Sequence, residues 1–163
     1  KAVEAAAKAA EQAAKAQPAA ETGDKPPGPD TAAAGADGDE QSLFDRGLAL
    51  VKEKKYDDAI GAFEQQLKRF PRGELSSTAM YWLGEMWRVA STPDLPKAGR
   101  YFYRVYNEYP KSSRASAAMY LHGLLTCQDD VAKGRVILNK VLIQHPSSKD
   151  AELAENALKN QCR

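Results

Sequence analysis

The sequence of 163 residues contains few of the residues that most often build catalytic or metal centres. It has two histidines and two cysteines, and their positions do not show the close spacing of a metal-ligand set. A glycine-rich phosphate-binding loop and the strained serine turn of a hydrolase nucleophile are both missing. We therefore predict a protein that is not an enzyme and that binds no cofactor and no metal.

Long apolar runs and a strong charge of one sign are missing as well. The mean hydropathy is −0.57 and no stretch is long and apolar enough to cross a bilayer, so we expect no membrane span. The formal net charge is +1 without a clustered basic stripe, which disfavours nucleic-acid binding. The first residue is Lys and no signal peptide is present, so we expect a processed chain or a fragment whose targeting information has been removed.

Residues 1–41 contain almost no large apolar side chain. Residues 1–17 are rich in Ala, Glu and Lys, and Val3 is their only larger aliphatic residue. We predict a solvated helical segment there, with the remnant of a coiled coil as the alternative. Residues 18–41 are mostly Pro, Gly, Ala and Asp, and we predict a disordered linker because they cannot bury enough apolar surface.

From residue 42 onwards the sequence repeats a helical pattern three times. A small residue is followed four positions later by a large apolar one and twelve positions later by proline, as in Ala59–Phe63–Pro71, Ala98–Phe102–Pro110 and Gly134–Leu138–Pro146. The small residue lets two helices approach, and the proline ends the second of them. A glycine with an aromatic three positions before it marks the first helix, as in Phe44–Gly47, Tyr81–Gly84 and Tyr120–Gly123. This periodicity predicts an all-α array of helix–turn–helix units.

The pattern predicts seven helices, with Ser42 as the N-cap of the first. They span residues 42–54, 56–70, 75–90, 95–109, 114–127, 130–145 and 149–161. They form three hairpins, at residues 42–71, 75–110 and 114–146, and a C-terminal capping helix at 149–161. Three repeats are about the minimum that buries a continuous core.

Gly47, Ala59, Phe63 and Pro71 have the spacing of a tetratricopeptide repeat, and two more copies follow. The strings AMYWLGEMW, VYNEYPKSSRASAAMYLHGLL and VLIQHPSSKDAELAENAL resemble the C-terminal tetratricopeptide domain of the Tol–Pal-associated periplasmic family CpoB/YbgF. The resemblance covers residues 42–163 and implies a tetratricopeptide-repeat superhelix. Gly134 departs from it, because alanine is usual there, and so does the longer turn after Trp87.

The resemblance also implies a function. It suggests a periplasmic adaptor of the Tol–Pal system that coordinates peptidoglycan synthesis with outer-membrane constriction in cell division. The implied partners are TolA and a penicillin-binding synthase, with homo-oligomers formed through an upstream coiled coil. Two alternatives stay open: an outer-membrane assembly component of the BamD type, and a self-assembling structural module.

By resemblance to the repeat, the first helices line a concave groove that binds a partner protein. Phe44, Tyr81 and Tyr120 would form its floor, with Glu85 and Arg88 as the central polar pair, since aromatic residues and arginine tend to dominate binding energy. The alternative is that the aromatic residues only pack one repeat on the next. The full predicted set is Phe44, Leu48, Val51, Lys52, Tyr81, Glu85, Arg88, Val89, Tyr120 and Leu124, with Cys127 and Gln128 at the matching positions of the third repeat.

Cys127 and Cys162 stand 17 and 16 residues after the preceding proline, on adjoining helices of the first type. Since those helices run roughly parallel, the two thiols should lie at the same level. A disulfide is expected in an oxidising compartment, and free thiols in a cytosol. His122 takes the position of Leu83 in the preceding repeat, so we predict a packed histidine there, and likewise at His145 before its proline.

Overall fold

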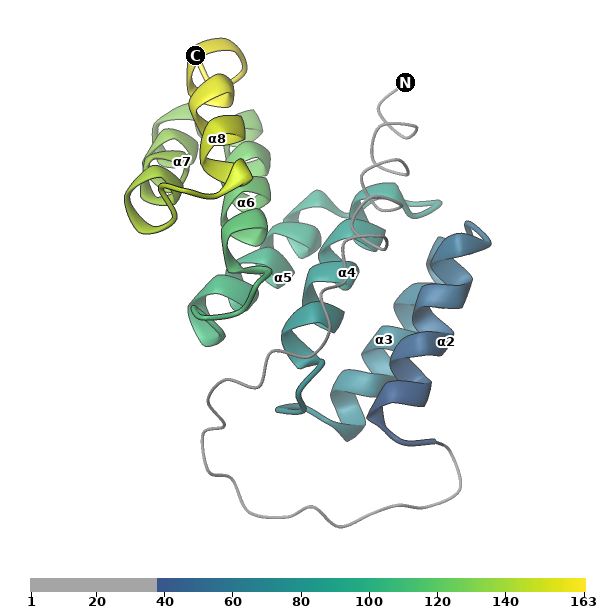
Figure 1. Ribbon diagram of the computed structural model, residues 1–163. Helices are drawn as coiled ribbons and strands as arrows, with labels where there is room; N and C mark the ends of the chain where they lie inside the picture. The colour runs from purple at the N-terminus through teal and green to yellow at the C-terminus, as the bar shows by residue number, and fades with distance from the viewer. Residues whose placement is uncertain (1–37) are drawn as a thin grey trace.

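The computed structural model describes residues 38–163, and all of its regular secondary structure in that range is α-helical (Figure 1). Helices α2 and α3, α4 and α5, and α6 and α7 form successive hairpins, and α8 packs on α6 and α7. The predicted helical segment 1–17 and residues 18–37 of the predicted linker lie outside the described residues. The helices are α2 (Glu40–Lys52), α3 (Tyr56–Arg69), α4 (Ser76–Val89), α5 (Leu95–Glu108), α6 (Ala115–Asp129), α7 (Val131–Gln144) and α8 (Lys149–Asn160).

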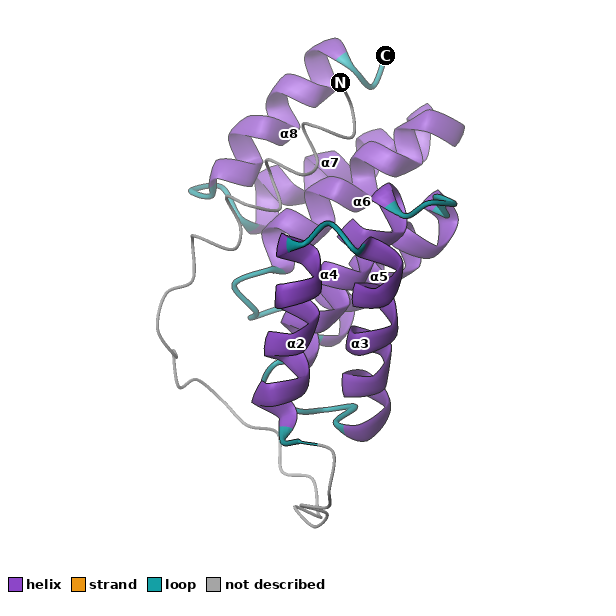
Figure 2. Cartoon of the chain, turned by 90° about the vertical axis from the view of Figure 1, so that its right-hand side faces the viewer, coloured by secondary structure: helices purple, strands orange, loops and turns teal. Residues whose placement is uncertain are grey.

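The predicted all-α repeat architecture is therefore confirmed, with three hairpins and a terminal helix. Seen from the side, the hairpins follow one another along the stack (Figure 2). Each helix of a hairpin contacts its partner, and the second helix of each hairpin contacts the first helix of the next unit. Between residues 38 and 163 no helix has both the length and the apolar character needed to cross a membrane.

Three helix boundaries differ from the prediction by two residues, namely both ends of α2 and the end of α6, and the others agree within one residue. Capping explains the start of α2 and the end of α6. Helix α2 begins two residues earlier because Asp39, and not Ser42, is its N-cap, and the Asp39 carboxylate accepts a hydrogen bond from the Ser42 backbone N–H at 2.8 Å. Residues 40 and 41, which were predicted as linker, are therefore helical. Helix α6 continues to Asp129 because Asp130 alone joins it to α7 and caps α7 by accepting from the Lys133 backbone N–H.

The recurring glycine and the recurring large apolar residue meet inside each hairpin. A Cβ added to Gly84 would lie 2.5 Å from the ring of Phe102, so only hydrogen fits at this position. The same contact occurs in the other hairpins, between Gly47 and Phe63 and between Gly123 and Leu138. All three large side chains are completely buried. The repeat pattern in the sequence thus corresponds to a knob on the second helix that enters a hole on the first.

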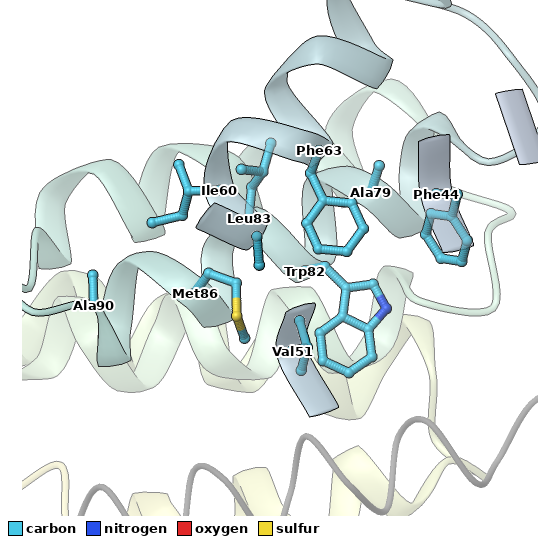
Figure 3. Packing of buried hydrophobic residues seen from close by; sticks show 10 residues of the cluster. Phe44, Val51, Ile60, Phe63, Ala79, Trp82, Leu83, Met86 and Ala90 are labelled. Carbon is cyan, nitrogen blue, oxygen red and sulfur yellow. The ribbon is translucent and has the colours of Figure 1, made fainter. Parts of the chain in front are cut away.

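Apolar clusters continue from each hairpin to the next. Between the first two hairpins Phe63 lies between Phe44 and Trp82, with ring centroids 5.6 and 6.5 Å apart (Figure 3). Trp82 is 1% exposed, so it is part of this core. The second cluster is built around Phe102 and the third around Leu138. Because each cluster needs side chains from two units, stacking is what buries the core.

The first helices are also joined by polar contacts near their N-terminal ends. The Glu40 carboxylate accepts hydrogen bonds from the backbone N–H groups of Glu74 and Leu75, at 3.0 and 2.9 Å. Glu40 stands seven residues before the recurring glycine of its repeat, Gly47. The equivalent positions in the next two repeats are Ser77 and Ser116. Ser77 accepts from Ser112 at 3.0 Å, and Ser116 donates to Asp150 at 2.6 Å. These contacts hold each first helix next to the start of the following one.

Candidate partner-binding site

Helix α4, the first helix of the second hairpin, carries a charged pair formed by Glu85 and Arg88. Arg88 donates from Nη1 to both carboxylate oxygens of Glu85, at 2.9 and 3.1 Å. Glu85 is 3% exposed, whereas the Arg88 side chain keeps 23% of its surface exposed. Burial raises the pKa of the Glu85 carboxyl, and the charge of Arg88 opposes that rise only in part. The pair therefore presents its guanidinium, and not its carboxylate, to the surroundings.

The N-cap of α6, Arg114, and side chains of α6 and α8 interact with Arg88 or with the neighbouring Tyr81. The Arg114 guanidinium lies over the Tyr81 ring, 5.3 Å from its centroid. The half-buried Tyr120 has its pKa raised by burial, while the charge of Arg88 lowers it and that of Asp150 raises it. Helices α4, α6 and α8 thus contribute to one surface. We call it the first-helix surface and define it by Tyr81, Glu85, Arg88, Arg114, Tyr120 and Asp150.

This surface has the chemistry of a recognition site. An arginine fork can bind a carboxylate through two parallel hydrogen bonds, and tyrosine offers an aromatic face with a polar end. Arg88 is already held by a buried partner, so little side-chain entropy remains to be lost when it binds. Within the described part of the chain, no group of three His, Cys, Asp or Glu side chains is arranged to hold a metal ion.

The ten predicted groove residues separate into buried and accessible ones. Phe44 is 1% exposed and packs on Phe63, and Tyr81 is 8% exposed and packs on Phe102 with ring centroids 5.8 Å apart. Val51 is buried too. The predicted floor of three aromatic rings is therefore corrected, because two of the rings fill the core between repeats and only Tyr120 keeps accessible surface. The accessible members are Leu48, Lys52, Arg88, Val89, Tyr120 and Leu124, and Glu85 acts from below through Arg88.

Arg114 and Asp150 were missed because they lie outside the inward positions used for the prediction. Each is the fourth residue after its proline, the position at which the first repeat has Leu75. That position changes from apolar to basic to acidic along the array. A comparison of the turns after Pro71, Pro110 and Pro146 would therefore have pointed to them.

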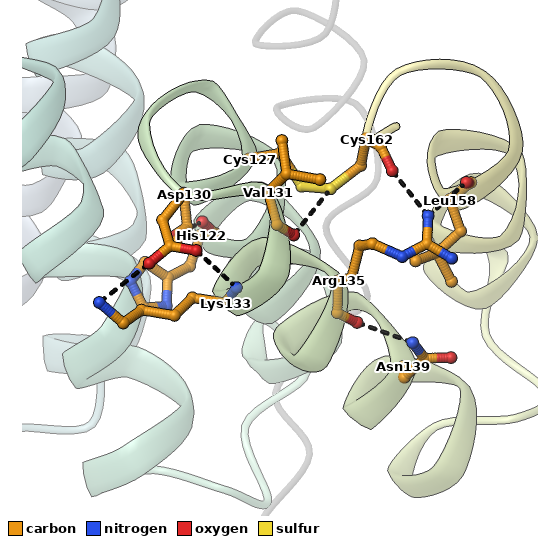
Figure 4. Close-up of a disulfide and its surroundings, with 10 residues drawn as sticks. His122, Cys127, Asp130, Val131, Lys133, Arg135, Asn139, Leu158 and Cys162 are labelled. Carbon is orange, nitrogen blue, oxygen red and sulfur yellow. Dashed lines mark hydrogen bonds and ion pairs between the residues drawn. A yellow bond between two sulfur atoms is a disulfide. The ribbon is translucent and has the colours of Figure 1, made fainter.

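Cys127 and Cys162 form a disulfide that ties the end of α6 to the segment after α8, with their Cα atoms 5.4 Å apart (Figure 4). Arg135 on α7 donates to the carbonyl oxygens of Leu158 and Cys162, at 3.0 and 2.7 Å. Gly134 accounts for the close approach of α6 and α7, since a Cβ there would lie 2.6 Å from the Cys127 backbone nitrogen. The residue that departs from the usual alanine is thus the one beneath the disulfide.

The buried Glu85 leads to a pH-dependent prediction. Its pKa is higher in the folded than in the unfolded protein, so its favourable contribution is present below the usual carboxyl value of about 4.5 and is lost as the pH rises through the folded pKa. Glu85→Gln should therefore raise the free energy of unfolding at pH 7 by about 1 kcal/mol, and this gain should vanish near pH 4. Urea denaturation across this range measures it, with the exposed Glu152→Gln as the control. A gain that does not change with pH would contradict the assignment.

Comparison with known proteins agrees with the repeat architecture. The family model described as Tetratricopeptide repeat matches residues 44–113. Two curated relatives, both named Cell division coordinator CpoB and both from Pseudomonas putida, are 36% identical to this chain over 47 residues. The matched region covers 29% of this chain and 18% of each relative, so the chain spans less than a fifth of the length of these relatives.

Proposed function

We propose that this chain, whose described residues form a tetratricopeptide-repeat domain resembling CpoB, is an adaptor that binds partner proteins through its first-helix surface. The observation that carries the proposal is the pair of Glu85 and Arg88. Burying a carboxylate costs free energy, and here the buried group holds a partly exposed arginine in place. A buried carboxylate that costs stability and fixes an arginine beside Arg114 and Tyr120 is better explained by recognition of a peptide than by stabilisation of the fold.

We further propose that the adaptor is periplasmic and acts in cell division beside the Tol–Pal system, with TolA and a penicillin-binding synthase as partners. Its similarity to proteins named Cell division coordinator CpoB supports the cell-division role. A disulfide between buried cysteines is consistent with an oxidising compartment. The rival proposals are an outer-membrane assembly component of the BamD type and a self-assembling structural module.

The combined substitution Arg88→Ala and Tyr120→Ala should weaken binding of the soluble periplasmic part of TolA by more than about 2 kcal/mol, because it removes the guanidinium and the aromatic face of the site. Titration followed by backbone amide shifts in NMR measures the affinity. Far-UV circular dichroism should stay unchanged, since both side chains are only partly buried.

The matched control replaces the same two residue types on a second helix, with Tyr103→Ala and Arg104→Ala on α5. If the control lowers the affinity and the α4–α6 variant does not, TolA docks on the other side of the array. If TolA does not bind at high concentration, the cell-division proposal fails. Sedimentation of a longer chain that includes the upstream region then tests self-assembly.

A further inference from the structure

A hollow of about 580 Å³ opens between α5 and α6, on different faces from the first-helix surface. On α6 it is lined by residues 122, 125, 126, 128 and 129, of which residues 122, 125, 126 and 129 form one helical stripe. Tyr120 and Leu124 of the predicted groove do not line it, whereas Gln128, at the matching position of the third repeat, does. The main lining residues are Leu95, Gly99, Arg100 and Tyr103 of α5 and His122 and Leu125 of α6.

The hollow lies where the first repeat has a buried side chain. Ile60 follows Ala59 on α3, is 6% exposed, and belongs to the same cluster as Leu83 and Met86 of α4 and its C-cap Ala90 (Figure 3). In the second repeat the residue after Ala98 is Gly99. The α6 residues equivalent to Leu83, Met86 and Ala90 are His122, Leu125 and Asp129, and all three line the hollow. The part of the hollow beside Gly99 therefore corresponds to the place that an isoleucine side chain fills in the first repeat.

The backbone at Gly99 does not need a glycine. A Cβ added there would meet only the Cδ2 of His122, at 3.6 Å, which is an ordinary van der Waals contact. Gly84 and Gly134, in contrast, have no room for a Cβ. A glycine in the middle of a helix lowers its stability relative to alanine. Glycine at position 99 thus lowers the stability of the helix and is not required by close packing, and it leaves an open space between α5 and α6.

The wall of the hollow is aromatic and held together. The Tyr103 ring meets the rings of Tyr106 and His122 edge to face, with centroids 5.5 and 5.9 Å apart. The Tyr106 hydroxyl lies 2.8 Å from His122 Nδ1, and burial lowers the pKa of His122, so the ring is neutral at pH 7. Tyr103 nevertheless keeps 46% of its surface exposed and Leu95 keeps 37%. These rings form a preorganised apolar wall beside the missing side chain.

The rim supplies a cation. Arg100 is exposed and forms no hydrogen bond or ion pair with any residue from 38 to 163. The lining contains one acidic side chain, Asp129, at the far end of α6. A carboxylate placed beside the aliphatic anchor would therefore be complementary to Arg100.

We propose that this hollow is a second docking site, for a partner segment that inserts an isoleucine- or leucine-sized side chain and places a neighbouring carboxylate against Arg100. The inserted group takes the place that corresponds to that of Ile60 between α3 and α4. Because the hollow and the first-helix surface use different faces of α6, the adaptor can hold two segments at the same time. This site does not depend on the function proposed for the first-helix surface.

The test uses the whole chain and a defined peptide, acetyl-Ala-Ile-Glu-Ala-amide. Backbone NMR shifts should saturate in the millimolar range at Gly99, Tyr103, His122 and Leu125. The peptide with alanine in place of isoleucine should bind at least about 10-fold more weakly, because it lacks most of the apolar surface that the hollow buries. Gly99→Ile should abolish binding while the melting temperature stays equal or rises, and Gly61→Ile on α3 is the matched control because its surroundings are open.

Arg100→Gln provides a second variant that leaves the core untouched. It should weaken binding of the peptide that contains isoleucine and glutamate about 3-fold or more. It should leave the affinity for the peptide that contains isoleucine and glutamine unchanged. Failure of the peptide to shift these residues, or equal shifts in Gly99→Ile, would overturn the proposal. Self-association that disappears in Gly99→Ile would instead identify a second copy of the chain as the occupant, and would overturn the assignment to a partner.

Discussion

Removal of the disulfide between Cys127 and Cys162 should lower the free energy of unfolding by about 4 kcal/mol, the value expected from chain entropy for residues 35 apart. The bond restricts the unfolded chain, so its loss favours the unfolded state. The effect should be large because α8 buries few apolar atoms of its own. Its buried side chains are Ala151, Ala154 and Ala157, which contribute little hydrophobic surface.

The loss should be uneven along the array. Helix α8 is held by the disulfide, by its alanines, by the hydrogen bond from Ser116 to Asp150 and by the two hydrogen bonds from Arg135, so reduction removes its only covalent cross-link to α6. Amide hydrogen exchange should accelerate in α8 and the end of α6, and it should stay nearly unchanged in α2–α5. The disulfide does not join these helices to the cap.

Chemical denaturation with and without a phosphine reductant measures the effect. The double variant Cys127→Ala and Cys162→Ala should unfold at the lower denaturant concentration and should not respond to the reductant. Equal midpoints for the oxidised and the fully reduced wild-type protein would show that the bond does not stabilise the fold. Faster exchange throughout all seven helices would contradict a local role in holding the cap.

Gly134→Ala should destabilise the protein by up to about 3 kcal/mol. The added Cβ would lie 2.6 Å from the backbone nitrogen of Cys127 and 2.8 Å from its Cα. A side-chain rotation cannot relieve a contact with the backbone, so α6 and α7 must move apart. That movement would disturb the apolar cluster around Leu138 and the alignment of Cys127 with its partner.

Gly61→Ala is the matched control, since it makes the same change on a second helix where nothing lies within 4 Å of the new atom. It should stabilise the protein by about 0.5–1 kcal/mol through higher helix propensity. Urea denaturation measures both variants. In the background of Cys127→Ala the cost of Gly134→Ala should persist, because the clash is with the backbone and not only with sulfur. Equal stability of Gly134→Ala and wild type would overturn this explanation of the departure from alanine.

The sequence by itself determined the helices and their order. The repeat prolines Pro71, Pro110 and Pro146 each follow the end of a second helix, and a small residue followed by a large apolar one favours the same crossing in each unit, so these signals are local. For this reason six of the seven helices begin within one residue of the predicted start. The exception is α2, where Asp39 supplies the cap because its carboxylate reaches the Ser42 N–H. The pairing of Glu85 and Arg88 was also accessible from sequence, since residues three apart on a helix share a face.

Only the tertiary structure decided which of these residues a partner can reach. Phe44 and Tyr81 have the repeat position of groove residues, but Phe63 and Phe102 from the second helices cover their rings. Arg114 and Asp150 lie 36 residues apart in the chain and meet around Tyr81 because α6 and α8 pack together. The hollow at Gly99 exists because Gly99 has no side chain and no side chain of α6 fills the space. Whether a side chain is buried, and which side chains meet, depends on atoms from other repeats. The sequence pattern of one repeat does not specify those atoms.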